Sequence, residues 1–135
     1  FFDDLEQMNS IIKAQTGNDA SIIRFPGGSS NTVSKDYCPG IMTQLVNDVT
    51  ARGLLYCDWN VSSGDANNKP ISTEQVVQNV ISGVQSHNVS VVLQHDIKDF
   101  SVNAVEQIIQ WGQANGYTFL PLTTSSPMSH HRVNN

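Results

Sequence analysis

Three short polar clusters contain side chains that could do chemistry together. They are residues 24–28 (RFPGG), 62–65 (SSGD) and 93–96 (LQHD). A histidine beside a carboxylate suits general acid catalysis near neutral pH, because the negative charge favours a protonated imidazole. An arginine adds a planar fork of donors that can hold another carboxylate. We therefore interpret Arg24, Asp65 and His95 as candidate parts of one catalytic site.

Each of these residues also has a purely structural interpretation. Arg24 could form an ion pair at a strand end, and Asp65 could form a turn in its loop of small residues. His95 could be a structural histidine that ends a strand. Leu93 would lie on the same face of that strand as His95, where it could line a small apolar pocket.

The three clusters come after apolar segments that are predicted to form β-strands. Strands are expected at residues 21–25, 54–59 and 89–93, with a fourth at 117–122. The carboxyl ends of successive parallel strands lie on one face of a sheet or barrel, which would bring the clusters to one pocket rim. Asp58 falls within the second strand, where a carboxylate is disfavoured unless it has a role or faces solvent.

Four helices are predicted around these strands. They are expected at residues 3–16, at 39–53 with Pro39 in the first helical position, after a capping Ser72, and from Ser101 or Asn103 to 115–116. Residues 60–71 are expected to form a long polar loop. The strands recur about every 30 residues, which is typical of βαβ crossovers. The predicted fold class is therefore α/β, built from parallel βα units.

The length of 135 residues suits one domain, which we place at residues 1–126, followed by a loose polar tail at 127–135. His130 and His131 lie in this tail, and we assign them no role. The first residues include neither an initiator methionine nor the basic segment of a signal peptide. We therefore expect the chain to begin inside a longer precursor.

Charge and composition exclude several classes of partner. The net charge is −5 and the seven Lys and Arg residues form no cluster, so binding to nucleic acid is not expected. No apolar run approaches the ~18 residues of a membrane-spanning helix. Only 14% of residues are charged, well below the usual ~25%, and polar uncharged residues fill the gap. Such a composition is common in secreted proteins.

The two cysteines do not indicate a metal site. Cys38 and Cys57 form no C-x-x-C pair and have no histidine at a zinc-binding spacing. Cys57, in an apolar strand, is interpreted as a small buried residue. A disulfide between the two cysteines is left open, because sequence does not supply its geometry.

The three clusters resemble, in order and spacing, the last three of the five motifs of the polysaccharide deacetylases, carbohydrate esterase family 4, with their NodB-type homology domain. Residues 24–28 match R-x-P-x-G, residues 59–65 match the region of D-x-x-D-W, and residues 93–95 match L-x-H. The resemblance runs from about residue 5 to residue 125. It implies that the chain forms the C-terminal half of a distorted (β/α) barrel.

The resemblance also implies a reaction and a role for each residue. In this family a divalent ion, usually zinc, and an aspartate base hydrolyse N-acetyl groups of a glycan such as peptidoglycan or chitin. By this likeness His95 would protonate the leaving amine and Asp65 would support it. Arg24 would orient the base, and Leu93 would contact the acetyl methyl group. The other residues implied to contact substrate are Pro26, Gly27 and Trp59.

The chain departs from the family pattern in two respects. Ser62 stands where the fourth motif has its first aspartate, and Ala66 stands where it has tryptophan. The first two motifs, T-F-D-D and H-S-x-x-H, supply the base and the metal ligands of the family. Residues 1–4 (FFDD) instead lead straight into a predicted helix, and the sequence contains no H-x-x-x-H. We therefore expect no metal bound by this chain and no activity of this chain alone.

The sequence thus predicts part of a secreted or cell-envelope deacetylase that acts on a glycan. Half a barrel leaves strand edges and apolar surface uncovered, so we expect self-association. The main alternative is a non-catalytic carbohydrate-binding or structural α/β module on the same scaffold. An enzyme of the α/β-hydrolase type is a third interpretation, but the sequence contains no G-x-S-x-G elbow.

Overall fold

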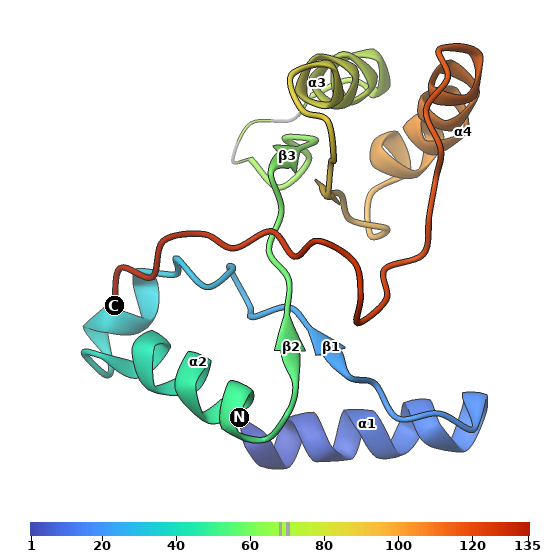
Figure 1. Ribbon diagram of the computed structural model, residues 1–135. Helices are drawn as coiled ribbons and strands as arrows, with labels where there is room; N and C mark the ends of the chain where they lie inside the picture. Colours follow the sequence, from blue (N-terminus) through green and yellow to red (C-terminus); the bar gives the residue numbers. More distant parts are fainter. Residues whose placement is uncertain (68, 70) are drawn as a thin grey trace. The chain divides into compact units, whose positions relative to one another are not determined.

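The computed structural model describes residues 1–67, 69 and 71–135 (Figure 1). These residues form two compact units. The first unit consists of Phe1–Cys57 together with Thr123–Asn135, and the second unit consists of Asp58–Leu122. Each unit contains one pair of parallel strands with a helix between them in the sequence. The expected α/β class with parallel βα units is therefore confirmed.

The first unit contains the first two predicted helices and the first two predicted strands. Its elements are α1 (Phe2–Thr16), β1 (Ile22–Ile23), the 3₁₀ helix η1 (Val33–Asp36), α2 (Ile41–Ala51) and β2 (Leu55–Tyr56). Asp3 and Asp4 lie in the first turn of α1, where their negative charges interact favourably with the partial positive charge of the helix N-terminus. Gly17 ends α1 at a φ of 77°, a conformation that glycine adopts without strain.

The core of the first unit is centred on three buried residues, Phe25, Met42 and Val49. The ring of Phe25 lies 5.3 Å from that of Tyr56 in β2, measured between centroids. Burying an apolar side chain of this size contributes roughly 1.5–3 kcal/mol. Helix α1 by contrast has no fully buried residue. Residue 25, which follows β1 and precedes the Pro-Gly-Gly turn, is therefore primarily a core residue.

The C-terminal segment is packed against the first unit, so the prediction of a loose tail is wrong. Gly40 and Thr43, at the N-terminal end of α2, donate their backbone N–H groups to Asn135 at 2.7 Å each. The first N–H groups of a helix have no partner within the helix, and Asn135 supplies the acceptors. Val133 packs against the core. The imidazole of His130 stacks on Tyr56 with ring centroids 4.2 Å apart.

The elements of the second unit are β3 (Val61–Ser62), α3 (Thr73–Gln85), β4 (Val92–Leu93) and α4 (Asp99–Ala114). Helix α3 packs against the short parallel sheet, and helix α4 packs against α3. β3 and β4 pair in the register Val61 to Val92. A methyl group added at Gly83 of α3 would lie 2.5 Å from Cγ1 of Val61, so glycine permits the close approach of α3 to β3.

The interface between α3 and α4 forms the core of the second unit. Val76, Val77 and Ala104 are buried there, with Ile71, Ile81, Phe100 and Ile108 packed around them. Val76, Val77 and Val80 of α3 are buried, whereas Ile81 and Val84 are only partly buried. Ser72 caps α3 as expected, and its hydroxyl accepts the N–H of Gln75 at 3.2 Å. The Gln75 side chain donates to Asn79.

Several predicted boundaries were wrong. The strand expected at residues 54–59 is shorter than predicted: β2 ends at Tyr56, and Asp58 lies outside it. The expected loop at 60–71 contains β3. The polar residues Asn60 and Ser62 give this segment the composition of a loop, so the sequence does not indicate a strand here. Asn60 bridges to the strand segment before β4: its amide nitrogen donates to Val89 at 2.8 Å and its amide oxygen accepts from Val91 at 2.7 Å. Asn68 and Pro70 of the same loop lie outside the described residues.

Three other elements also differ from expectation. Residues 117–122, all within the described chain, form no strand; Tyr117 stacks on Trp111 of α4, and Phe119 lies against Gly112. α4 begins at Asp99, ahead of the two predicted starts, and an acidic residue suits its first turn. α2 begins at Ile41 and not at Pro39. Cys38 is exposed, Cys57 is buried as predicted, and no disulfide joins them.

Candidate active site

Asp65 is a buried carboxylate in the turn that follows β3. Its side chain is 2% exposed. Gly64, with a φ of 78°, turns the backbone immediately before it. The Asp65 N–H donates to the hydroxyl of Ser63 at 3.3 Å, which is the short local pattern of a Ser/Thr turn. The turn thus directs the carboxylate into the second unit.

His95 meets this carboxylate two residues after β4. Nδ1 of His95 lies 2.9 Å from Oδ1 of Asp65, and the backbone N–H of His95 donates to Oδ2 at 2.7 Å. The carboxylate accepts, so the Nδ1 hydrogen is the donor, and this bond selects the tautomer of the neutral ring. The imidazole is 32% exposed. It is therefore held at one nitrogen while its other edge can meet a substrate.

The first turn of α4 supplies the remaining contacts to Asp65. The buried hydroxyl of Ser101 donates to Oδ2 of Asp65 at 2.7 Å. The ammonium of Lys98 donates to the backbone carbonyl of Asp65, also at 2.7 Å. Neither contact is predicted from the sequence, where Ser101 is interpreted only as a possible helix start.

These contacts keep Asp65 ionised. Burial alone would raise the pKa of its carboxyl group. Hydrogen bonds from the Ser101 hydroxyl, from the ring and the backbone N–H of His95, and from Ser63 outweigh burial and lower the pKa of Asp65 to about 2. Asp65 is therefore negatively charged at neutral pH. Such a charge can stabilise a neighbouring histidine in its protonated form.

The other predicted site residues divide between the two units. Leu93 ends β4, pairs with Ser62 and is partly buried, and Trp59, also partly buried, lies before β3 in the second unit. Arg24, Pro26 and Gly27 follow β1 in the first unit and are exposed; the carbonyl of Pro26 accepts from the amide of Asn31 at 3.0 Å. The structure brings Asp65 and His95 together, and the roles given to the other residues stay predictions.

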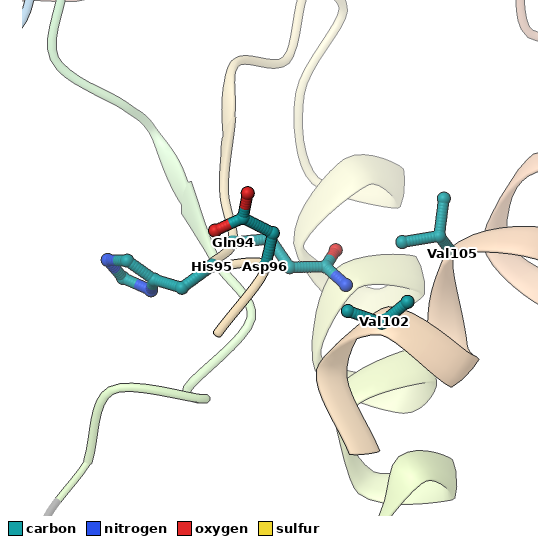
Figure 2. Close-up of a pocket in the computed structure, with 5 residues that line it drawn as sticks. All are labelled: Gln94, His95, Asp96, Val102 and Val105. Carbon is teal, nitrogen blue, oxygen red and sulfur yellow. The ribbon is translucent and has the colours of Figure 1, made fainter. Parts of the chain in front are cut away.

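A depression of about 260 Å³ lies beside the Asp65–His95 pair in the second unit. Its lining residues are Gln94, His95, Asp96, Val102 and Val105. Figure 2 shows the amide of Gln94 extending toward the two valines, whereas the imidazole of His95 points away from them. The depression therefore lies on the side of residue 95 that faces away from its imidazole ring.

The donor groups of the described residues do not fit a zinc ion on their own. Zinc sites use at least three protein ligands drawn from His, Cys, Asp and Glu. Among residues 1–67, 69 and 71–135, no three such side chains lie close enough together to hold a metal ion. In that same part of the chain, no helix is long and apolar enough to cross a membrane.

Comparison with known proteins finds that the chain is similar to deacetylases. No family model matches it. It is 28% identical over 123 residues to a peptidoglycan-N-acetylglucosamine deacetylase of Bacillus cereus, which covers 88% of this chain and 42% of that protein. The crystallised catalytic domain of a peptidoglycan N-acetylglucosamine deacetylase from Eubacterium rectale is 98% identical, with a TM-score of 0.98 over 100% of this chain and 61% of that one.

A further solved structure agrees at lower identity. A polysaccharide deacetylase from Bacillus cereus superimposes with a TM-score of 0.74 at 26% identity, over 93% of this chain and 58% of that one. The chain thus spans less than half of its curated relative and about three fifths of the two crystallised chains. It shares both its sequence and its fold with the polysaccharide deacetylases of carbohydrate esterase family 4, and it corresponds to a part of their catalytic domain.

Proposed function

We propose that this chain supplies the proton-donating part of a deacetylase that hydrolyses N-acetyl groups of a glycan of the peptidoglycan or chitin type. The observation that carries the proposal is the 2.9 Å hydrogen bond between the buried Asp65 carboxylate and Nδ1 of His95. The names of the relatives, which are peptidoglycan deacetylases, support the choice of substrate class.

In the proposed reaction His95 acts as general acid. Asp65 holds the Nδ1 hydrogen, so the proton on Nε2 is the one directed to the substrate. As the bond between the acetyl carbon and the amine nitrogen breaks, Nε2 delivers this proton to the nitrogen, which leaves as a neutral amine. Positioned proton transfer of this kind typically accelerates a reaction 10²–10⁴-fold. Asp65 stays ionised and stabilises the imidazolium before the transfer.

The remaining site residues are proposed to bind and orient. Leu93 contacts the acetyl methyl group, and Arg24 orients the carboxylate that acts as base. Pro26, Gly27 and Trp59 line the glycan groove. The positions of Arg24, Pro26 and Gly27 after β1 and of Leu93 at the end of β4 support this, because ligands of parallel sheets and barrels bind at the carboxyl ends of strands. Trp59 precedes β3, so its proposed role rests on the resemblance alone.

The metal and the base are proposed to come from residues outside this chain. A divalent ion, zinc in the parent enzyme, would polarise the acetyl carbonyl and activate a water molecule. The two short parallel pairs are proposed to belong to the C-terminal half of a distorted barrel. This chain alone is therefore expected to be inactive, and the parent enzyme is expected to work at the cell envelope or outside the cell, where peptidoglycan is found.

The proposal is tested with a chimera. The present chain replaces the matching segment of the Eubacterium rectale catalytic domain, and acetate release is measured with zinc on an N-acetylated peptidoglycan fragment. The chain alone is assayed in parallel. We expect release by the chimera, its loss with His95→Ala, and no release by the chain alone. Metal-dependent release by the chain alone, or an active His95→Ala chimera, contradicts the proposal. Binding of the glycan without release by the chimera supports the carbohydrate-binding alternative.

A further inference from the structure

Ser101 has a contact that its place in α4 does not require. A serine in the first turn of a helix commonly bonds to nearby backbone groups. The hydroxyl of Ser101 instead donates to Oδ2 of Asp65 at 2.7 Å, across 36 residues of sequence. Both residues are buried, since Ser101 as a whole is 0% exposed and Asp65 as a whole is 3% exposed. The bond is therefore shielded from water. Hydrogen bonds to a charged group are stronger in such a buried environment than in water.

The two oxygens of the Asp65 carboxylate have different tasks. Oδ2 accepts two donors at 2.7 Å, the Ser101 hydroxyl and the backbone N–H of His95. Oδ1 accepts the ring of His95 at 2.9 Å. An aspartate carboxylate can rotate about its Cβ–Cγ bond unless hydrogen bonds hold its oxygens in place. The donors on Oδ2 stop this rotation and keep Oδ1 in line with Nδ1.

We propose that Ser101 is a positioning residue of the acid pair, acting through Asp65 to hold the imidazole of His95 in one orientation and one tautomer. The role of the pair in catalysis rests on the proposed function, but the positioning itself does not. The other groups that meet this carboxylate or its backbone are the side chains of Ser63 and Lys98. Lys98 binds the backbone carbonyl of Asp65, so Ser101 is the only α4 side chain among the described residues found on the carboxylate oxygens.

The test is nuclear magnetic resonance on the whole 135-residue chain without substrate. The carboxyl carbon of Asp65 is titrated, and the exchange of the His95 Nδ1 hydrogen with water is measured in the wild type and in Ser101→Ala. We expect Ser101→Ala to raise the pKa of Asp65 by about one pH unit, because one hydrogen bond to the charged form is lost. The Nδ1 hydrogen is expected to exchange at least several-fold faster. Ser101→Thr, which keeps the hydroxyl, should restore both values.

A destabilised helix could change these signals indirectly, so a second variant is needed. Ala104→Gly alters a buried residue of the same helix, 0% exposed, that does not bond to Asp65. It is expected to lower stability while leaving the Asp65 titration and the His95 exchange unchanged. Unchanged values in a folded Ser101→Ala variant, or equal changes in Ala104→Gly, overturn the proposal. An inactive chimera would contradict the proposed function without changing these spectra, so the two failures are distinguishable.

Discussion

Oδ1 of Asp65 lies 2.9 Å from Nδ1 of His95, although the two residues are 30 positions apart in the sequence. Parallel pairing makes this contact possible, because β3 leads to Asp65 and β4 leads to His95 from the same end of one sheet. The helix that follows β4 then closes the site through Ser101. Two loops and one helix turn therefore build the pair, and they do so within a single unit of the chain.

Asp65→Asn should destabilise the second unit. The amide keeps the shape of the side chain, but it has no charge and has only one acceptor oxygen for three donors. We expect the free energy of unfolding to fall by about 2–3 kcal/mol. Urea titration followed by tryptophan fluorescence is suitable, because Trp59 and Trp111 both lie in this unit. Asp96→Asn, at an exposed neighbour of His95, is the matched control and should change stability by less than about 0.5 kcal/mol. Equal effects of the two substitutions would refute a special role of Asp65.

The stability of the second unit should fall in acid. The pKa of Asp65 is about 2 in the folded chain, against an ordinary value of 3.8, so the unfolded chain binds this proton more tightly. The stabilisation is therefore complete above about pH 5 and is lost as the pH falls through 2. It amounts to about 2 kcal/mol.

Acid unfolding measured between pH 6 and pH 1.5 in the wild type and in Asp65→Asn checks this window. The variant should lack the part of the pH dependence that Asp65 causes, so the two stability curves should converge as the pH decreases. Parallel curves over this range would show that the Asp65 proton is not linked to folding.

Asn135→Ala should loosen the start of α2. The substitution removes the side-chain oxygen that accepts the N–H of Gly40, while the backbone carbonyl that accepts from Thr43 remains. The cost is expected to be about 0.5–2 kcal/mol, as for the loss of a helix cap. Hydrogen exchange should become faster at Gly40, with a smaller effect at Thr43. Asn134→Ala, at the exposed neighbouring position, serves as control, and the prediction fails if it has the same effect on exchange.

The isolated chain is expected to self-associate. In the described residues each sheet has only two strands, so each has unpaired edges. Large apolar side chains are also exposed, among them Met8 at 56%, Phe119 at 54% and Leu120 at 79%. Light scattering over a range of concentrations should show a mass that increases above the 14.8 kDa of one chain. A single species of that mass at all concentrations contradicts the expectation.

Local sequence patterns predicted the helices better than the strands. Helices α1 and α3 follow from apolar periodicity and from the capping Ser72, which act over a few residues. Strand β3 was missed because its pairing with β4 depends on residues about 30 positions away. The segment 117–122, expected to be a strand, pairs with no other strand among the described residues, and Tyr117 and Phe119 pack on α4.

The candidate site could also be predicted only in part from local sequence. Asp65 and His95 could be chosen from the sequence, because clusters of polar residues after apolar segments are visible there. The contact of Ser101 with Asp65 depends on the angle at which α4 begins, which no local pattern encodes. His130 was given no role, yet Nε2 of its ring lies 3.0 Å from the carbonyl of Tyr56, a contact between distant segments.

The most direct measurement compares two substrates of the chimera that differ in leaving group. The leaving amine of an N-acetylglucosamine substrate must receive a proton from a general acid, whereas 4-nitrophenyl acetate releases a stable phenolate that needs no proton. If His95 is the general acid, His95→Ala should reduce kcat/KM on the amide by about 10²–10⁴-fold and on the activated ester by less than about tenfold. An equal loss on both substrates, or no loss on the amide, would contradict the assignment of His95 as the acid.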